Sequence, residues 1–205
     1  MSTVCHRLGL GVILLLLSSA TLAYVWEPNV YGGIEIQFNR NDVVKNRNNV
    51  QRVDNKPYFS PNQSSTGIFA GTHMDEYWGI EVGYSWFSKT SKTISFIGYP
   101  NTALKNETNS LHVDFMGYLP ANEEFSLIGN LGLGFMTTKL EGRYNGTQLD
   151  QLSGRSSRAG FRIGAGVRYL LPYGLGIRMM AKHNQGNKIL KHTNSVNFGF
   201  FYQYP

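Results

Sequence analysis

Charged side chains of both signs recur within apolar stretches of this chain, where an unpaired charge would be costly to bury. They are Glu35, Glu81, Asp114, Arg162, Arg168, Arg178 and Lys182. Each occupies the polar position of a segment in which polar and apolar residues alternate. A guanidinium can bind a carboxylate through two parallel hydrogen bonds, so acids and bases crowded into a narrow space are expected to pair. The chemistry that these residues predict is ion pairing.

Nucleophilic catalysis is the alternative chemistry, and only one pair of residues approaches it. His192 and Ser195 lie near the start of the last apolar segment. A serine hydrolase acting on lipid A would need a serine, a histidine and an acid grouped on one face. Three positions on a regular strand place His192 and Ser195 on opposite faces, and no acid adjoins them. We therefore predict no catalytic residues and expect that the protein is not an enzyme.

Metal and cofactor sites have equally little support. The histidines His73, His112, His183 and His192 lie in different segments without metal-ligand spacing. The glycines of GNLGLG, at positions 129 to 134, lie in a continuous strand pattern with no helix after them, so they do not predict a phosphate-binding loop. We expect no metal and no cofactor.

The segments that must position the charges read as β-strands, and the clearest lie between Thr66 and Phe87. Trp78, Ile80, Val82, Tyr84 and Trp86 share one face, while the other face carries glycine, serine and Glu81. Alternate side chains of a strand point to opposite faces. An apolar stripe with aromatic residues at both ends is typical of a strand that crosses a membrane.

The same alternation recurs through the chain and predicts eight strands, near residues 30–39, 67–74, 78–87, 111–118, 125–135, 158–169, 175–184 and 196–204. Long polar connections at 40–65, 88–109 and 139–156 and a shorter one at 185–193 alternate with tight turns at 75–76, 120–124 and 172–174. The fold class is therefore all-β: an eight-stranded antiparallel up-and-down transmembrane β-barrel, closed because lipid offers no partners to a free strand edge. Its lumen would be polar, would also receive Arg158, and would be filled by side chains.

The N-terminal residues 1–23 read as a secretory signal peptide, with His6 and Arg7 ahead of an apolar run and small residues at Ala20 and Ala23. We place cleavage after Ala23, with Ala20 as the alternative, and assign residues 24–205 to one barrel domain. Cys5, the only cysteine, would leave with the signal. The net charge of +6 is scattered, so no nucleic-acid partner is expected.

Three stretches carry a family resemblance: GIFAGTHMDEYWGIEVGYSW, MGYLPANEEFSLIGNLGLGF and GAGVRYLLPYGLGIR. They resemble the transmembrane domain of OmpA-type outer-membrane proteins of Gram-negative bacteria. The likeness covers nearly all of residues 24–205, and a peptidoglycan-binding domain is not expected. It implies that Glu81 pairs with Arg178 and that Asp114 pairs with Arg168. In the family, such a network plugs the barrel and has been proposed to gate a narrow channel.

The last strand resembles the signal that the barrel-assembly machinery reads, through Asn197, Gly199, Tyr202 and Tyr204. The aromatic residues expected at the membrane interfaces are Trp78, Tyr84, Trp86, Tyr169, Tyr202 and Tyr204. The sequence thus predicts a cell outer-membrane protein with a structural or surface role, including that of a narrow gated pore.

An adhesin or other interaction protein is the alternative, because the long connections are basic. They carry Lys45, Arg47, Arg52, Lys56, Lys89, Lys92, Lys105, Arg143 and Arg155. The expected partners are outer-membrane lipid, lipopolysaccharide, and host or phage surface ligands.

Overall fold

Strands make up most of the described part of the computed structural model, which comprises residues 29–43, 60–96 and 99–204. The signal peptide expected over residues 1–23 lies outside these ranges. The strands are β1 (Asn29–Val43), β2 (Asn62–His73), β3 (Trp78–Phe87), β4 (Thr90–Phe96), β5 (Tyr99–Pro120), β6 (Phe125–Tyr144), β7 (Thr147–Gln148), β8 (Gly154–Leu170), β9 (Leu175–Gln185) and β10 (Leu190–Gln203). Two 3-10 turns, η1 (Asp150–Leu152) and η2 (Pro172–Gly174), complete the set.

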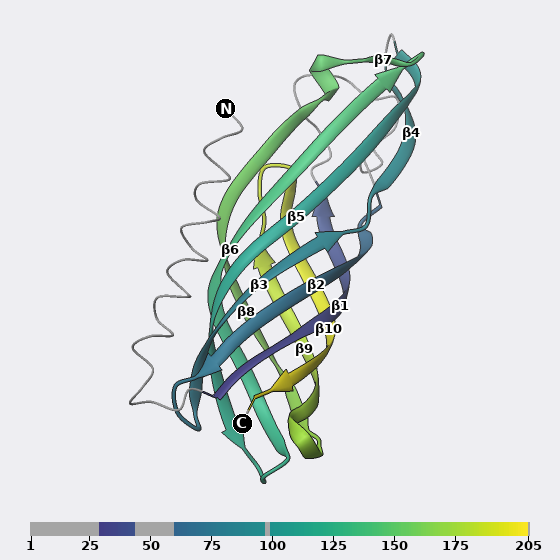
Figure 1. Cartoon of the computed structure of the whole chain (residues 1–205). Helices are drawn as coiled ribbons and strands as arrows, with labels where there is room; N and C mark the ends of the chain where they lie inside the picture. The colour runs from purple at the N-terminus through teal and green to yellow at the C-terminus, as the bar shows by residue number, and fades with distance from the viewer. Residues whose placement is uncertain (1–28, 44–59, 97–98, 205) are drawn as a thin grey trace.

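Eight of these strands form a closed antiparallel barrel (Figure 1). The pairing order runs β5-β3-β2-β1-β10-β9-β8-β6, and β5 pairs with β6 to close the ring. Strands β4 and β7 are added at the outer ends of β5 and β6. The predicted eight-stranded up-and-down barrel is confirmed. Among the described residues, no helix is long and apolar enough to cross a membrane.

The barrel wall has an apolar outer face and a largely polar inner face, as the alternation predicts. On β8, Ile163 is 57% exposed on the outer wall, whereas its neighbour Arg162 is 4% exposed and lies inside. Strand β5 keeps the same alternation as far as Tyr118, with Met116 and Tyr118 inside. A lipid environment would accept the outer face without any cost of exposing it to water.

Tight turns gather at one end of the barrel, together with the start of β1 and the end of β10, and we call this the turn end (Figure 1). Asp75 accepts hydrogen bonds from the backbone amides of Tyr77 and Trp78, at 2.7 and 2.8 Å. Asn122 does the same for the turn between β5 and β6, and both arrangements are Asx turns. The opposite end, where β4 and β7 lie, is the loop end.

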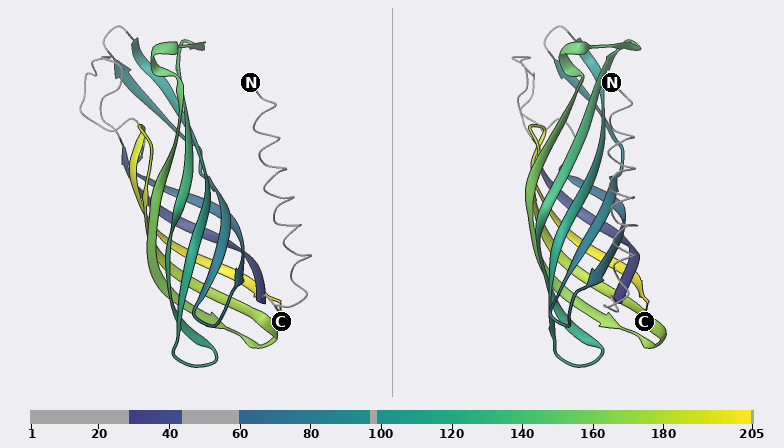
Figure 2. Two further views of the ribbon diagram at one scale, coloured as in Figure 1. Left: turned by 90° about the vertical axis from the view of Figure 1, so that its left-hand side faces the viewer. Right: turned by 60° about the vertical axis from the view of Figure 1, so that its left-hand side comes forward.

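Two of the predicted long loops are instead largely strand. Residues 88–109 contain β4 and the first half of β5, and residues 139–156 contain the end of β6, β7, η1 and the start of β8. Strand β2 also begins at Asn62, earlier than the predicted residue 67. The loop-end parts of β4, β5, β6, β7 and β8 project beyond the rest of the barrel (Figure 2), and we call them the projecting strands. Polar side chains on both sides hid the pattern, because Thr102, Asn106 and Thr108 are buried on the inner side among its apolar residues.

The apolar residues on the inner side of the loop end pack together, and we call them the outer cluster. They are Phe87, Ile94, Phe96, Leu104, Met136, Leu140, Leu152, Ile189 and Leu190. Two smaller clusters lie inside the barrel toward the turn end. One contains Met116, Tyr118, Ile128 and Met180, and the other contains Tyr31, Phe69 and Phe201. The polar middle of the lumen therefore lies between apolar side chains at both ends.

Candidate functional site

All seven charged side chains singled out in the sequence lie inside the barrel and are buried: Glu35, Glu81, Asp114, Arg162, Arg168, Arg178 and Lys182. They come from strands β1, β3, β5, β8 and β9. The strand register puts Glu81 beside Asp114 on neighbouring strands. Arg158, which shares the inward parity of Arg162, is instead exposed, because β8 extends there beyond its pairing with β9.

Arg178 is the centre of the network. Its two terminal nitrogens bind both carboxylate oxygens of Glu81, with Nη2 3.0 Å from Oε1, and Nη1 bound to Oε2. Nη2 also donates to Glu35, at 3.1 Å, and Lys182 lies 3.5 Å from the same carboxylate. The Tyr31 hydroxyl donates to Glu81 at 3.1 Å. Two acids and two bases are thus joined in one buried, charge-balanced group.

Glycines make these contacts possible across the strands. Gly199 lies between Glu35 and Arg178 in the register, and Gly132 lies between Asp114 and Arg162. A Cβ atom at Gly132 would lie 2.2 Å from Asp114 Oδ1, so the carboxylate occupies the space that a side chain would need. Acid and base on alternate strands can therefore meet over the strand between them.

The expected pair of Asp114 and Arg168 is wrong. Asp114 pairs with Arg162, whose Nε lies 3.2 Å from Oδ1. Arg168 lies nearer the turn end, where it binds Gln203 and His73 Nε2, the latter at 2.7 Å. Parity decides whether a side chain lies inside the barrel, but the stagger between strands sets its position along the barrel axis. The register places Asp114 and Arg168 at different positions along that axis.

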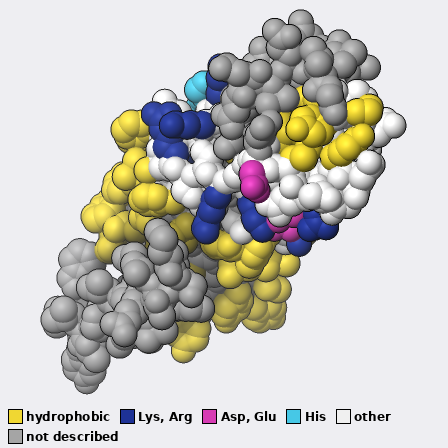
Figure 3. Space-filling view, turned by 90° about the horizontal axis from the view of Figure 1, so that it is seen from above, with side chains coloured by type: hydrophobic (Ala, Val, Ile, Leu, Met, Phe, Trp, Pro, Cys, Tyr) yellow, Lys and Arg dark blue, Asp and Glu magenta, His cyan; other side chains and the backbone are white. Residues whose placement is uncertain are grey.

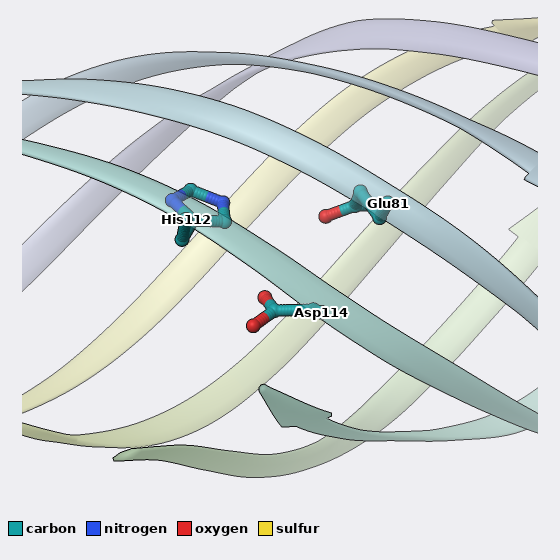
Figure 4. A group of neighbouring side chains, drawn as sticks. All are labelled: Glu81, His112 and Asp114. Carbon is teal, nitrogen blue, oxygen red and sulfur yellow. The ribbon is translucent and has the colours of Figure 1, made fainter. Parts of the chain in front are cut away.

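His112 joins Glu81 and Asp114 in a group that the sequence did not predict (Figure 4). One ligand atom of each lies within 4.8 Å of the others, and all three side chains are buried. His112 and Asp114 project from β5 toward the space that Glu81 faces from β3 (Figure 4). The carboxylates already bind Arg178 and Arg162, so a metal ion would have to compete with two guanidinium groups. We assign this group to the ion-pair network.

The nearest approximation to a hydrolase pair does not assemble. Ser195 is buried inside the barrel, whereas His192 is exposed on the outside. His192 stacks on His183, with ring centroids 5.5 Å apart. The two candidate residues therefore lie on opposite sides of the wall.

The predicted interface aromatics lie on the outer wall toward its two ends. Trp78, Tyr169, Tyr202 and Tyr204 are near the turn end, while Tyr84 and Trp86 are nearer the loop end. Of the proposed assembly signal, Asn197 and Gly199 face the lumen, and Tyr202 and Tyr204 face outward.

Charged residues also line the outward side of the projecting strands. Lys89 binds Glu107 at 2.9 Å, and Lys139 binds Glu141 at 2.6 Å. The hydrogen bond from Lys89 lowers the pKa of Glu107, and that from Lys139 lowers the pKa of Glu141. Seen from above, Lys and Arg side chains gather in groups over the hydrophobic wall (Figure 3). Lys45, Arg47, Arg52 and Lys56 lie outside the described residues.

Comparison with known proteins identifies a family and several similar folds. A family model described as "Outer membrane protein beta-barrel domain" matches residues 10–203. Among solved structures, Neisserial surface protein A is 13% identical with a TM-score of 0.59, covering 85% of this chain and 97% of its own. OprG from Pseudomonas aeruginosa is 12% identical with a TM-score of 0.55, covering 86% and 96%.

Ail, the attachment invasion locus protein of Yersinia pestis, is 15% identical with a TM-score of 0.51, covering 86% of this chain and 97% of its own. A search of the curated proteins finds no significant match. These likenesses agree with the closed eight-stranded barrel and its apolar outer wall. The chain belongs to the outer membrane protein β-barrel domain family, is of the OmpA type, and resides in the outer membrane.

Proposed function

We propose that the protein is a non-catalytic surface barrel whose lumen is closed to ions. The observation that carries this proposal is the buried network of Arg178, Glu81, Glu35 and Lys182 across the middle of the lumen. An eight-stranded barrel leaves only enough room for side chains, so such a network occupies the permeation path. The strands then serve as a membrane anchor for the projecting loop end.

The apolar clusters at both ends support a closed state. Leu104 and Leu190 of the outer cluster are at most 1% exposed, and Met116 and Met180 are as fully buried near the turn end. Ions would have to cross these apolar layers as well as the ion-pair network. Apolar side chains raise the cost of moving a charge, although buried Asn106, Thr138 and Asn187 lie among those of the outer cluster.

Planar-bilayer recordings of the refolded protein test this proposal. We expect no channel conductance from the wild-type protein, with heat-dependent gel mobility as the control that the barrel has formed. Reproducible single-channel steps from folded wild-type protein would overturn the closed-lumen proposal. They would favour the narrow gated pore, in which Glu81 and Arg178 form the gate.

Surface binding is a second candidate, favoured by the length of the projecting strands. Strand β5 has 22 residues and β6 has 20, whereas about 9–11 suffice to cross the membrane. Their outward side presents Lys105, Lys139 and Arg143, and Lys89 just before β4 binds Glu107 on β5. These cations would attract anionic partners such as lipopolysaccharide or host and phage surface ligands. Outer-membrane lipid and the barrel-assembly machinery complete the proposed partners.

A charge-neutralised variant tests this second candidate. Replacing Lys89, Lys105, Lys139 and Arg143 with glutamine should reduce binding to anionic lipopolysaccharide vesicles and weaken the salt dependence of that binding. The matched control replaces Arg162 with lysine, which alters the lumen and preserves the net charge. Undiminished vesicle binding by the folded quadruple variant would contradict a role for the projecting strands.

A further inference from the structure

A vestibule of about 390 Å³ opens at the turn end of the barrel. Outer-membrane barrels carry their short turns on the periplasmic side, so we infer that this end faces the periplasm. The inner part is lined by Arg168, His73, Tyr118 and Gln203, and the mouth is lined by acidic residues of the turns. This site adjoins the Arg178 network, because the Tyr118 hydroxyl lies 3.0 Å from that of Tyr31, which donates to Glu81. The proposal for it does not depend on whether the lumen conducts. Two features need a common explanation: a buried arginine and a ring of carboxylates around the opening.

Arg168 lacks a carboxylate partner among residues 29–43, 60–96 and 99–204, although it is only 9% exposed. It donates to Gln203 Oε1 and to His73 Nε2. An arginine can only donate, so His73 Nε2 accepts and His73 is neutral, with its proton on Nδ1. The charge of Arg168 is therefore held by neutral groups.

Aromatic rings fix the same guanidinium in place. Its central carbon lies 4.8 Å from the Phe201 ring centroid and 5.5 Å from that of Tyr118. These contacts orient the group, and the two hydrogen bonds use two of its five N–H donors. A buried charge without a counter-ion is costly, and a planar guanidinium matches a carboxylate closely. The inner part of the vestibule is thus suited to a carboxylate.

The mouth has the opposite preference, because Asp75, Glu76, Glu123 and Glu124 all line it. Asp75 is engaged in its turn, and Glu124 accepts a hydrogen bond from Tyr169. The carboxyl groups of Glu76, which Tyr77 contacts, and Glu123 also line the opening, where carboxylates would repel a simple anion and attract an ammonium group. A ligand that satisfies both parts must carry both charges.

We propose that the periplasmic vestibule binds a small zwitterionic amine, with its carboxylate on Arg168 and an ammonium group among the carboxylates of the mouth. Amino acids with a basic side chain have this chemistry, and so does a peptide end that carries a free carboxylate near an amine. The ligand enters from the periplasm and binds without crossing the barrel.

Three probes of matched shape test the proposal on the full barrel in lipid nanodiscs. Lysine carries the carboxylate and two amines, cadaverine is lysine without the carboxylate, and hexanoate is a carboxylate without amines. Binding is followed by NMR shifts of the Arg168 Nε–H and the Gln203 side-chain amide. We expect lysine to bind at least about tenfold more tightly than either other probe, since a charge-assisted hydrogen bond supports a difference of that size.

Variants assign the two halves of the site. Arg168→Met should lower lysine affinity about tenfold, to that of cadaverine, whereas Arg155→Met, at the exposed loop end, should leave it unchanged. Because Arg168→Met could impair folding, Glu76→Gln with Glu123→Gln provides a second test: it should weaken lysine and strengthen hexanoate. Equal affinity for lysine and cadaverine, unchanged lysine binding in folded Arg168→Met, or no binding of any probe would each overturn the proposal.

Discussion

At the scale of single residues, the charged side chains of the lumen form ion pairs, and glycines on the intervening strands leave room for the partners to meet. Arg178 is bound by two carboxylates and lies with its guanidinium carbon 3.5 Å from the Phe69 ring centroid. Removing one member of such a group leaves the partner buried and unpaired, which costs more than the pair contributes. The energetic effect of a lumen substitution should therefore exceed that of a surface ion pair.

Glu81→Gln measures this difference because it removes charge and keeps the shape of the side chain. We expect it to lower the free energy of unfolding by about 3 kcal/mol, the low end for breaking a buried pair, since Glu35 still contacts Arg178. Guanidinium unfolding of the barrel in lipid vesicles gives the value. Glu107→Gln, which breaks the exposed pair with Lys89, is the matched control and should cost less than about 1 kcal/mol. Equal effects of the two substitutions would contradict a stabilising role for the network.

Gly132→Ala tests the space between Asp114 and Arg162. The new Cβ would lie 2.2 Å from Asp114 Oδ1 and 2.3 Å from the Val113 carbonyl oxygen, so the pair must separate and the strands must shift. A loss of at least about 1–3 kcal/mol is expected for overpacking of this kind. Gly117→Ala on β5, where nothing lies within 4 Å, should be nearly neutral in the same unfolding measurement. A neutral Gly132→Ala would mean that Asp114 does not lie over Gly132.

The sequence predicted which residues face the lumen, except for Arg158, and the family resemblance implied the pair of Glu81 and Arg178 that the structure shows, but the partner of Asp114 was wrong. Parity was sufficient for Glu35, Asp114 and Arg168, because inward and outward positions alternate strictly. The heights of these residues depend on the stagger of neighbouring strands, which no local pattern in the sequence encodes. Asp114 therefore pairs with Arg162 instead of Arg168. The sequence also did not predict that His112 lies close to Glu81.

At the scale of elements, the projecting strands bury apolar and uncharged polar residues on the inner side and carry charged residues on the outer side. Leu104 on β5 and Leu140 on β6 pack in the outer cluster, while Lys105 and Glu141 lie on the opposite side. Polar residues occupy both sides of residues 99–109, because Thr102, Asn106 and Thr108 are buried on the inner side beside Leu104 while Lys105 faces outward, and this mixture made the stretch resemble a loop. Outside the membrane the outward face of a strand can be polar, so a high average polarity did not show where β5 begins.

Leu104→Ala tests whether the outer cluster holds these strands together. Removing a fully buried leucine costs about 2–5 kcal/mol, and we expect the loss to fall on β4 and its pairing with β5. Amide hydrogens of β4 should exchange at least about tenfold faster, while those of β1 and β10 keep their protection. Leu111→Ala, on the outer wall of the same strand, should leave β4 unchanged. Uniform acceleration through the whole barrel would instead indicate that the projection and the barrel unfold as one unit.

At the scale of the whole molecule, the two faces of one closed wall explain both the fold and its location. A strand such as β9 carries Ile177 and Met179 outward, with Arg178 and Met180 inward. In water this arrangement would expose a continuous apolar wall, whereas in a bilayer the same wall is buried. The alternation, strand number and tight turns were all predictable because each follows from local sequence. Closure followed from the requirement that no strand edge be left in lipid.

Neighbouring methionines on β9 allow a direct test of this orientation. Met179 is 45% exposed on the outer wall, whereas Met180 is 1% exposed in the lumen. Cys5, the only natural cysteine, lies within the expected signal peptide, so Met179→Cys and Met180→Cys would each carry a single spin label in the exported chain. We expect oxygen dissolved in the lipid to accelerate the spin relaxation of the label at 179. The label at 180 should be immobile and shielded from oxygen. Because the two sites differ by one residue and share one native side-chain type, reversed accessibilities would refute the assignment of the outer wall to lipid.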